Sequence, residues 1–340
     1  MKRISLALAI ALAAAAAAPL AHAGSAISGA GSSFAAPLYA RWAAAAAAAT
    51  GIALRYQAIG SGAGINRILH RAVDFGASDM PVPADLLATY GLLQFPSVIG
   101  GVDILVNLPG IGADRLKLTG PVLARIYLGE ITRWNDPAIV ALNPGLSLPA
   151  LAITAVHRLD GSGTTFVFTE YLGMQSPRWK ARIGASTAIV WPVGVAAKGS
   201  DGLARAVGRI NGAIGYAESA YAVRAHLSTA LLRNKAGMFV APTMAAFAAA
   251  AASADWARAR HFAVDLNDQP GAASWPIESA SFVLLPRDPK DPQQNALVTR
   301  FFDWGFRHGG EIAEGLLYVP LPAPVQAAIR AAWKTLPGQE

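Results

Sequence analysis

The chain has 340 residues, of which 54% are hydrophobic and 14% charged, and it contains no cysteine. This composition permits a sizeable core and argues against intrinsic disorder, and the length favours two domains. The lack of cysteine in the sequence excludes disulfides, thiolate metal sites, a catalytic cysteine and the acceptor of a bacterial lipoprotein anchor. The formal charge of +7 suits an anionic ligand or surface, but the Lys and Arg residues are scattered, so no run predicts nucleic-acid binding.

Residues 1–23 have the pattern of a cleavable secretory signal. Lys2 and Arg3 give a basic start, an apolar run follows, and Ala21-His22-Ala23 is a small-x-small cleavage site. The apolar run is shorter than the ~20 residues that a membrane-spanning helix needs. We therefore expect an exported protein without a lipid anchor, and the loss of two signal cations lowers its formal charge from +7 to +5.

Two turns of Gly, Ala and Ser near the start of the chain each precede a predicted helix. Residues 28–34 lead into a helix over 35–49, and residues 60–64 separate a strand over 52–59 from a helix over 65–73. The unpaired N–H groups at a helix N-terminus attract anions, so both turns are candidate anion sites. The second turn lacks the last glycine of the dinucleotide fingerprint and the lysine of a phosphate-binding loop, so it predicts neither nucleotide motif.

A short strand is predicted over 73–79, and it ends in the carboxylate of Asp79. Pro81 and Pro83 stop regular structure just after it. A carboxylate at a strand end is either a turn residue or a ligand contact, and the local sequence leaves both interpretations open.

The rest of the chain alternates short buried strands with helices, a pattern that indicates an α/β fold. Strands are predicted over 92–99, 101–108, 152–156, 189–193, 214–216 and 281–285. Helices are predicted over 116–128, 137–142, 201–210, 218–225, 244–252, 297–308 and 325–333.

We place the first domain crossing near Val98 and the return crossing near Trp275. One α/β domain is then discontinuous, with residues 24–98 plus 275–340, and the second α/β domain spans 99–274. A ligand cleft is expected between the two domains.

The strand over 152–156 delivers an unusual segment at its carboxyl end, the edge where open α/β sheets bind ligands. The segment, Arg158-Leu159-Asp160-Gly161-Ser162-Gly163-Thr164-Thr165-Phe166, combines a cation, a carboxylate, hydroxyls and glycines just before a predicted helix over 165–172. This pattern is typical of an anion site built from a helix N-terminus and an arginine fork. It is also good turn chemistry, in which Ser162 serves only as an N-cap.

Taken in order, these segments closely resemble the phosphate-binding proteins of bacterial phosphate-specific ABC import systems, which are periplasmic binding proteins. The resemblance runs essentially from end to end of the chain. The matching segments are Gly29-Ala30-Gly31-Ser32-Ser33-Phe34, Ile59-Gly60-Ser61-Gly62, Val73-Asp74-Phe75-Gly76-Ala77-Ser78-Asp79, Phe95-Pro96 with Gly100-Gly101, Ile126-Tyr127-Leu128-Gly129, Trp134-Asn135-Asp136-Pro137, Arg158 to Thr164, Gly212-Ala213-Ile214-Gly215-Tyr216 and Trp275-Pro276-Ile277.

The resemblance implies the α/β periplasmic-binding-protein fold, with two domains joined by two crossing strands that hinge shut on phosphate. It also implies a periplasmic monomer without enzymatic activity or cofactor, which delivers phosphate to the membrane permease subunits of an ABC transporter. The family's ligand contacts map onto the hydroxyl of Ser33, the backbone of Phe34, Ser61, Asp79, Arg158, Ser162, Gly163 and Thr164, with Asp160 holding Arg158 in place. The family often has Thr at the position of Ser33 and Ser or Gly at that of Ala63, and His157 replaces a frequently basic residue. These departures leave every mapped contact in place.

Within this interpretation Asp79 is the residue that distinguishes phosphate from sulfate. Phosphate near neutral pH carries a proton that a carboxylate can accept, whereas sulfate carries none and would force two buried negative groups together. Sites that pair with a ligand O–H reject analogues without it by ~10⁴–10⁵. Arg158 supplies a full positive charge, while serine and threonine hydroxyls and backbone N–H groups supply the remaining donors.

Proteins of other classes explain the sequence less well. A serine hydrolase needs a glycine two residues before its nucleophile, but Asp160 precedes Ser162 at that spacing and Ile59 precedes Ser61. Ser200 has Lys198 there. A metal-dependent enzyme is disfavoured because the histidines after the signal are isolated from one another. A binding protein for another oxyanion and a surface-interaction protein of the same fold remain alternatives.

Overall fold

A computed structural model describes residues 25–338 of the chain, so the signal peptide predicted over 1–23 lies outside the described residues. Strands and helices alternate along the sequence, as the α/β prediction requires. Within residues 25–338, no helix combines the length and the apolar character that crossing a membrane requires.

Ten strands form one curled sheet that runs through the whole molecule. They are β1 (Ala26–Gly31), β2 (Ala53–Ala58), β3 (Phe75–Ser78), β4 (Leu92–Val106), β6 (Thr154–Arg158), β7 (Val195–Ala197), β8 (Ala213–Glu218), β9 (Ser228–Thr229), β12 (Glu278–Pro286) and β13 (Tyr318–Val319). The order is β2-β1-β3-β12-β4-β8-β6-β7, with β13 and β9 pairing with β4 beside this path. A separate small sheet contains β5 (Lys117–Leu118), β10 (Leu231–Arg233) and β11 (Phe239–Val240).

Helices cover both halves of the large sheet. They are α1 (Ala36–Thr50), α2 (Ser61–Leu69), α3 (Ala84–Thr89), α4 (Gly120–Tyr127), α5 (Pro137–Val140), α6 (Gly163–Gln175), α7 (Pro177–Arg182), α8 (Gly199–Arg209), α9 (Ser219–Arg224), α10 (Met244–Ala252), α11 (Pro292–His308), α12 (Gly310–Glu314) and α13 (Ala323–Trp333), with short 3-10 turns at Trp256–Arg258 and Arg260–Phe262.

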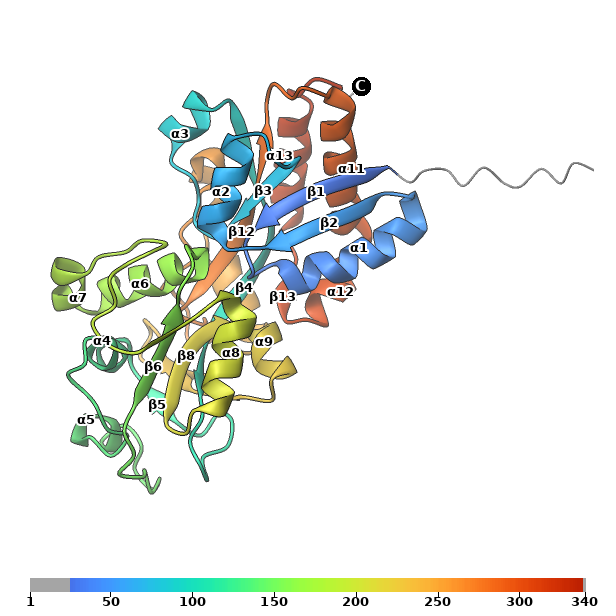
Figure 1. Cartoon of the computed structure of the whole chain (residues 1–340). Helices are drawn as coiled ribbons and strands as arrows, with labels where there is room; N and C mark the ends of the chain where they lie inside the picture. The colour runs from blue at the N-terminus through green and yellow to red at the C-terminus, as the bar shows by residue number, and fades with distance from the viewer. Residues whose placement is uncertain (1–24, 339–340) are drawn as a thin grey trace, which may run out of the picture.

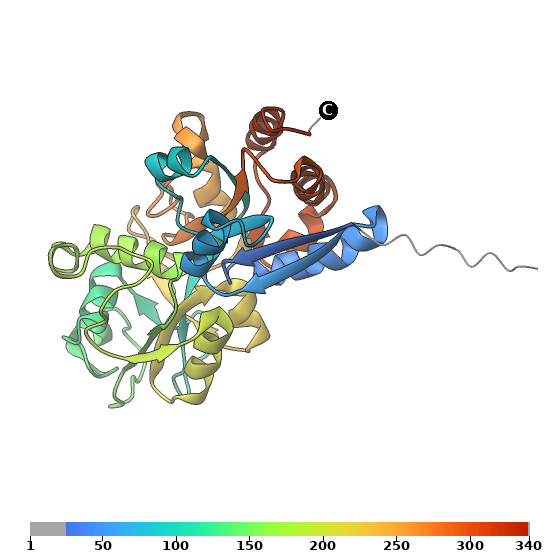
Figure 2. The ribbon, with the colours of Figure 1, turned by 45° about the horizontal axis from the view of Figure 1, so that its top comes forward.

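The elements gather into two lobes (Figure 1). We call β1 to β3 with α1, α2, α11 and α13 the first lobe, and β6 to β8 with α4 to α9 the second lobe. Strands β4 and β12 lie between the two groups, in the middle of the strand order, and Figure 2 shows the same ribbon turned by 45°. In the first lobe β1 pairs parallel with β2 and β3, and in the second β6 pairs parallel with β7 and β8. The carboxyl ends of these strands therefore point toward the junction of the lobes.

Strand β4 joins the two lobes without interruption, and all its residues are buried. Its first part, through Gly101, pairs antiparallel with β12, and residues Val102 to Val106 pair antiparallel with β8. The prediction of two strands separated at Gly100-Gly101 was therefore wrong. These glycines keep the strand intact and leave room for aromatic rings, since a Cβ at Gly100 would lie 2.9 Å from Cζ of Phe34.

Two other sequence predictions were also wrong. Residues 189–193 form no strand in the described chain, because Pro192 lacks the N–H that a sheet partner needs, and the strand forms instead as β7. The helix predicted over 116–128 begins only at Gly120, after the short strand β5. Thr119 caps it by accepting a hydrogen bond from the Val122 N–H at 3.4 Å.

Aromatic side chains fill the core of each lobe. In the first lobe the ring of Tyr39 meets the ring of Phe302 edge to face at 5.6 Å between centroids, and its hydroxyl lies 2.7 Å from the Ser97 Oγ. In the second lobe Phe168 stacks on Tyr216 at 4.3 Å. Helices α1 and α6, which carry Tyr39 and Phe168, are thus held against the sheet by large buried surfaces.

Gly64 in α2 tests how closely this helix must approach the sheet. We expect Gly64→Ala to lower the free energy of unfolding by roughly 1–3 kcal/mol, because the new Cβ would lie 2.7 Å from the Ala30 carbonyl oxygen and 2.9 Å from that of Ala77. Gly173→Ala in α6 is the control: its Cβ would find Lys180 Cβ at an ordinary 3.9 Å, and better helix propensity should leave stability equal or raised by up to ~1 kcal/mol. Urea unfolding of both variants measures the difference. Equal stability of the two variants would contradict the close approach.

Candidate functional site

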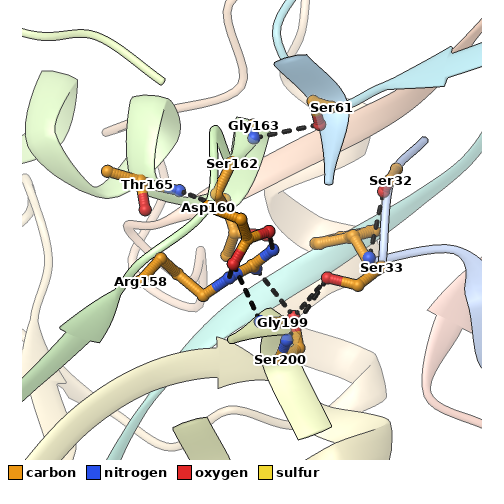
Figure 3. Close-up of polar contacts among 12 residues, drawn as sticks. Ser32, Ser33, Ser61, Arg158, Asp160, Ser162, Gly163, Thr165, Gly199 and Ser200 are labelled. Carbon is orange, nitrogen blue, oxygen red and sulfur yellow. Dashed lines mark hydrogen bonds and ion pairs between the residues drawn. The ribbon is translucent and has the colours of Figure 1, made fainter. Parts of the chain in front are cut away.

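The candidate site lies where the two lobes meet, at the starts of four helices. In the first lobe α1 follows Ser33 and Phe34, and α2 begins at Ser61. In the second lobe α6 and α8 begin at Gly163 and Gly199. The close-up in Figure 3 shows side chains from both lobes converging on this region. Four helix starts supply a concentration of N–H groups that favours negative charge.

Asp79 is the buried carboxylate of the site and is 2% exposed. One of its oxygens accepts hydrogen bonds from the hydroxyls of Ser32 and Ser281, the latter at 2.9 Å. The other oxygen faces the hydroxyls of Ser61 at 3.4 Å and Thr164 at 3.5 Å, which belong to opposite lobes. The carboxylate therefore lies at the junction of the lobes, surrounded by hydroxyl donors.

Burial raises the pKa of Asp79 to about 6, from an ordinary value of 3.8. The hydroxyls of Ser32 and Ser281 and the positive charge of Arg158 act in the opposite direction, but they only partly offset the loss of solvent. At pH 7 the group is an ionised acceptor that binds a proton more readily than an exposed aspartate.

Ser61 links the two lobes through its hydroxyl oxygen. The oxygen accepts the N–H of Gly163 at 2.9 Å and the N–H of Asp79 at 3.2 Å. The backbones also meet here, since the N–H of Gly62 donates to the carbonyl of Gly161 at 3.0 Å. A Cβ on Gly163 would lie 2.6 Å from both the Asp79 nitrogen and the Ser61 Oγ, so only glycine permits this approach.

Arg158 and Asp160 form a buried ion pair at the end of β6. Besides the salt bridge through Nη2, the Nε of Arg158 donates to Asp160 Oδ1 at 2.9 Å, and that oxygen also accepts the N–H of Gly199 at 2.8 Å. Nη1 of Arg158 donates to the Ser200 hydroxyl at 3.1 Å. Burial alone would raise the pKa of Asp160, but the hydrogen bond and charge of Arg158 outweigh it and lower that pKa.

Ser33 and Phe34 connect the first lobe to α8 and to the sheet. The Ser33 Oγ lies 2.9 Å from the Ser200 Oγ and accepts the Ser200 N–H at 3.3 Å. The Ser33 carbonyl accepts a hydrogen bond from the Tyr221 hydroxyl at 2.8 Å. The Phe34 N–H donates to the Ser32 hydroxyl at 3.0 Å.

Ser162 is the N-cap of α6, as one interpretation of the sequence expected. Its Oγ accepts the N–H of Thr165 at 3.1 Å, and the residue is buried. A capping hydroxyl still has a proton to donate, so this contact is compatible with a second role as a donor to a ligand.

Hydrogen bonds and chain neighbours bring together all nine residues that the sequence mapped to the site: Ser33, Phe34, Ser61, Asp79, Arg158, Asp160, Ser162, Gly163 and Thr164. The structure adds four that sequence reasoning missed, namely Ser32, Gly199, Ser200 and Ser281. Gly199 and Ser200 repeat the pattern of a Gly/Ser turn before a helix, which was a usable signal. Ser281 has no local signal, because it reaches Asp79 only through the pairing of β12 with β3.

Among residues 25–338, no three His, Asp or Glu side chains lie together as a metal site would require. The charged groups of the candidate site are instead one carboxylate among hydroxyls, Asp79, and one arginine held by an aspartate, Arg158 with Asp160. This donor and acceptor set suits an oxyanion that carries a proton.

Comparison with known proteins defines the class to which this fold and site belong. A family model described as "PBP superfamily domain" matches residues 16–307, which is most of the chain. The chain is also similar in fold to a high-affinity periplasmic phosphate-binding protein whose structure holds phosphate at pH 8.5. The TM-score is 0.72 at 23% identity, covering 90% of this chain and 93% of the other. The predicted class, an α/β periplasmic-binding-protein fold, is confirmed.

Closer relatives give the family. The phosphate-binding protein PstS of Pasteurella multocida is 50% identical over 309 residues, covering 91% of this chain and 90% of the relative. The phosphate-binding protein PstS of Haemophilus influenzae is 47% identical over 317 residues, covering 93% and 95%. The chain belongs to the PstS family of phosphate-binding proteins. This is a family of binding proteins rather than enzymes, in agreement with the sequence prediction.

The raised pKa of Asp79 has a consequence for stability without ligand. Because the folded-state pKa of about 6 lies above the ordinary 3.8, the folded protein binds this proton more tightly, so stability falls as the pH rises from about 4 to about 6 and stays lower above it. Asp79→Asn removes this effect. We expect the variant to gain up to about 3 kcal/mol of unfolding free energy over wild type at pH 7.5, and much less at pH 4.5.

Urea unfolding of wild-type and variant protein across this pH range measures the difference. Asp74→Asn, at the opposite end of β3, is the control. The Asp74 carboxylate accepts hydrogen bonds from Ser28 and Gln294, so the comparison is of how each variant's stability changes with pH rather than of its stability at one pH. A gain for Asp79→Asn that is the same at pH 4.5 and pH 7.5 would contradict the raised pKa.

Proposed function

We propose that this chain binds inorganic phosphate in the periplasm and delivers it to the permease subunits of a phosphate ABC transporter. The observation that carries the proposal is Asp79, a buried carboxylate between the lobes that faces hydroxyls on both sides. A buried carboxylate in a site rich in N–H donors is useful to a protonated oxyanion and harmful to an unprotonated one. The phosphate named in the PstS relatives has the required proton.

The ligand contacts that we propose are the hydroxyls and backbone groups already described, with Asp160 acting through Arg158. They are Ser33, Phe34, Ser61, Asp79, Arg158, Asp160, Ser162, Gly163 and Thr164. Asp160 orients the guanidinium and offsets part of its charge, so the ligand is held largely by dipoles and can still be released. The chemistry needs neither a cofactor nor a metal.

We propose that the two lobes open and close about β4 and β12. The proposed first domain contains residues 24–98 and 275–340, and the second contains residues 99–274. Support comes from the contacts between Gly62 and Gly161 and between Ser61 and Gly163, which join the lobes across the site. Tight binding then requires both domains, since each supplies part of the donor set.

We also propose that residues 1–23 are removed on export and that the mature protein works as a monomer without a lipid anchor. The order of basic, apolar and small residues supports removal of the segment, and the lack of cysteine in the sequence supports a protein without a lipid anchor. The monomer is what the family resemblance implies. Mass spectrometry of protein recovered from the periplasm of an expressing bacterium would identify the first residue.

Phosphate is expected to stabilise the protein against heat, and sulfate is not. A ligand at a hundredfold excess over its Kd adds about 2.7 kcal/mol to stability, so phosphate should raise the Tm by an amount that grows with its concentration. The measurement is thermal unfolding of ligand-free protein with either anion at equal ionic strength, supported by a direct calorimetric titration with phosphate.

Equal shifts with phosphate and sulfate would show that the site recognises tetrahedral anions without selecting a proton. Incubation with a chromogenic phosphomonoester serves as the control for catalysis. Turnover of the ester would favour the hydrolase alternative, and capture of phosphate without turnover is the expected result.

Asp79→Asn should change selectivity as well as affinity. The amide no longer places a full negative charge against an unprotonated oxygen, so we expect the ratio of sulfate Kd to phosphate Kd to fall by at least tenfold. Isothermal titration with both anions gives the ratio, and Asp74→Asn at the other end of β3 again serves as the control. A ratio identical to that of the wild type would show that Asp79 is not the residue that discriminates.

A further inference from the structure

A second buried carboxyl group lies beside the candidate site. Glu218 is the last residue of β8 and immediately precedes α9. It is 1% exposed, and among residues 25–338 neither of its carboxyl oxygens has a hydrogen-bond partner of normal geometry. A buried, unpartnered carboxylate is strongly unfavourable, whereas the neutral acid tolerates burial far better. The proposed phosphate contacts do not explain why a glutamate is buried here without a partner.

Groups from five parts of the fold interact with Glu218, and several belong to the site. They are Asp79 after β3, Arg158 on β6, Ser200 on α8, Tyr221 on α9 and Tyr318 on β13. The negative charge of an ionised Glu218 in turn helps to raise the pKa of Arg158. Glu218 thus lies within electrostatic reach of both the arginine and the carboxylate that we propose to hold the anion.

Burial and the negative charge of Asp79 raise the pKa of Glu218 to about 8, against opposing effects of Arg158 and the Ser200 hydroxyl. At pH 7 the group is therefore mostly a neutral acid. An anion bound near Arg158 adds negative charge close by. The bound state must therefore hold this proton more tightly than the ligand-free state.

We propose that Glu218 is a positioning residue of the anion site and that it stays protonated while the anion is bound. Phosphate affinity should therefore fall at pH values where Glu218 of the ligand-free protein loses its proton. The inference rests on the proposed function and extends it to regulation by pH. When neutral, Glu218 adds no negative charge near Arg158 and does not repel the ligand. When ionised, it adds a second buried negative charge next to Asp79 and the anion. The direction follows from linkage: a group that binds its proton more tightly in the complex weakens binding as the pH rises above its value in the free protein.

The chain contains a matched comparison in Glu278 at the start of β12. Glu278 is also 1% exposed, and its oxygens also have no hydrogen-bond partner within the described residues. Burial raises its pKa too, but no charged group of the site contributes to that change. The two glutamates share burial and lack of partners, and they differ in their coupling to Arg158 and Asp79.

The experiment is calorimetric titration with inorganic phosphate from pH 7 to pH 9.5 at constant ionic strength, with wild type, Glu218→Gln and Glu278→Gln. In the upper part of this range phosphate stays a dianion and Asp79 stays ionised, so Glu218 is the group expected to titrate. The wild-type Kd should rise above pH 8, approaching tenfold per pH unit for one coupled proton. Glu218→Gln should have a Kd that changes less than about twofold between pH 8 and pH 9.5, since an amide has no proton to lose. Glu278→Gln should follow the wild type.

A second measurement needs only the wild-type protein and covers the case in which Glu218→Gln does not fold. Titration at pH 8.5 in two buffers of different ionisation enthalpy gives the number of protons taken up on phosphate binding, which should lie clearly above zero and below one. Parallel pH profiles for wild type and Glu218→Gln, or zero proton uptake by the wild type, would overturn the inference while phosphate binding at pH 7 still supports the proposed function. A wild-type protein that binds no phosphate at pH 7 would instead overturn the proposed function, and this inference with it.

Discussion

The buried ion pair of Arg158 with Asp160 is the interaction on which the rest of the site depends. Asp160 accepts two donors from Arg158 and the N–H of Gly199, so one carboxylate fixes both the guanidinium and the start of α8. It also reaches the opposite lobe, where a Cβ on Gly60 would collide with its side chain. Removing one member of such a pair would leave an uncompensated buried charge. The pair therefore fixes the guanidinium and the start of α8, and it brings Asp160 against Gly60 of the first lobe.

This arrangement explains how a protein can hold an anion without much bare positive charge. Arg158 is already paired with Asp160, and it also interacts electrostatically with two buried carboxyl groups, Asp79 and Glu218. Attraction must then come from hydroxyls and helix N-termini, which are individually weak and are distributed over both lobes. In the proposed function, affinity then requires both lobes to meet around the ligand, and selectivity is expected to come from Asp79, whose ionised carboxylate favours a protonated ligand.

Local patterns predicted the parts of this structure that depend on neighbours in sequence. The Gly/Ser turns before α1, α2 and α6, and the position of Arg158 at a strand end, are visible because helix starts and strand ends have local signatures. Ser281 could not be found in this way, since its contact with Asp79 spans 202 positions and exists only through sheet pairing. The division of β4 at Gly100 failed for a similar reason. Glycine usually weakens a strand, but here rings from distant segments pack over it.

The same strand connects the site to the proposed hinge. Phe34 contributes its backbone to the site, while its ring packs over Gly100 and lies 5.8 Å from the ring of Tyr318. Two residues further along β4, Val102 pairs with Glu218 of β8. The charges of Asp79 and Arg158 both change the pKa of this glutamate. Gly100 and Val102 of β4 are therefore in contact with Phe34, which belongs to the candidate site, and with Glu218 of β8, which is buried beside it. If the lobes close about β4 as we propose, these contacts would couple ligand binding, closure and proton uptake at Glu218.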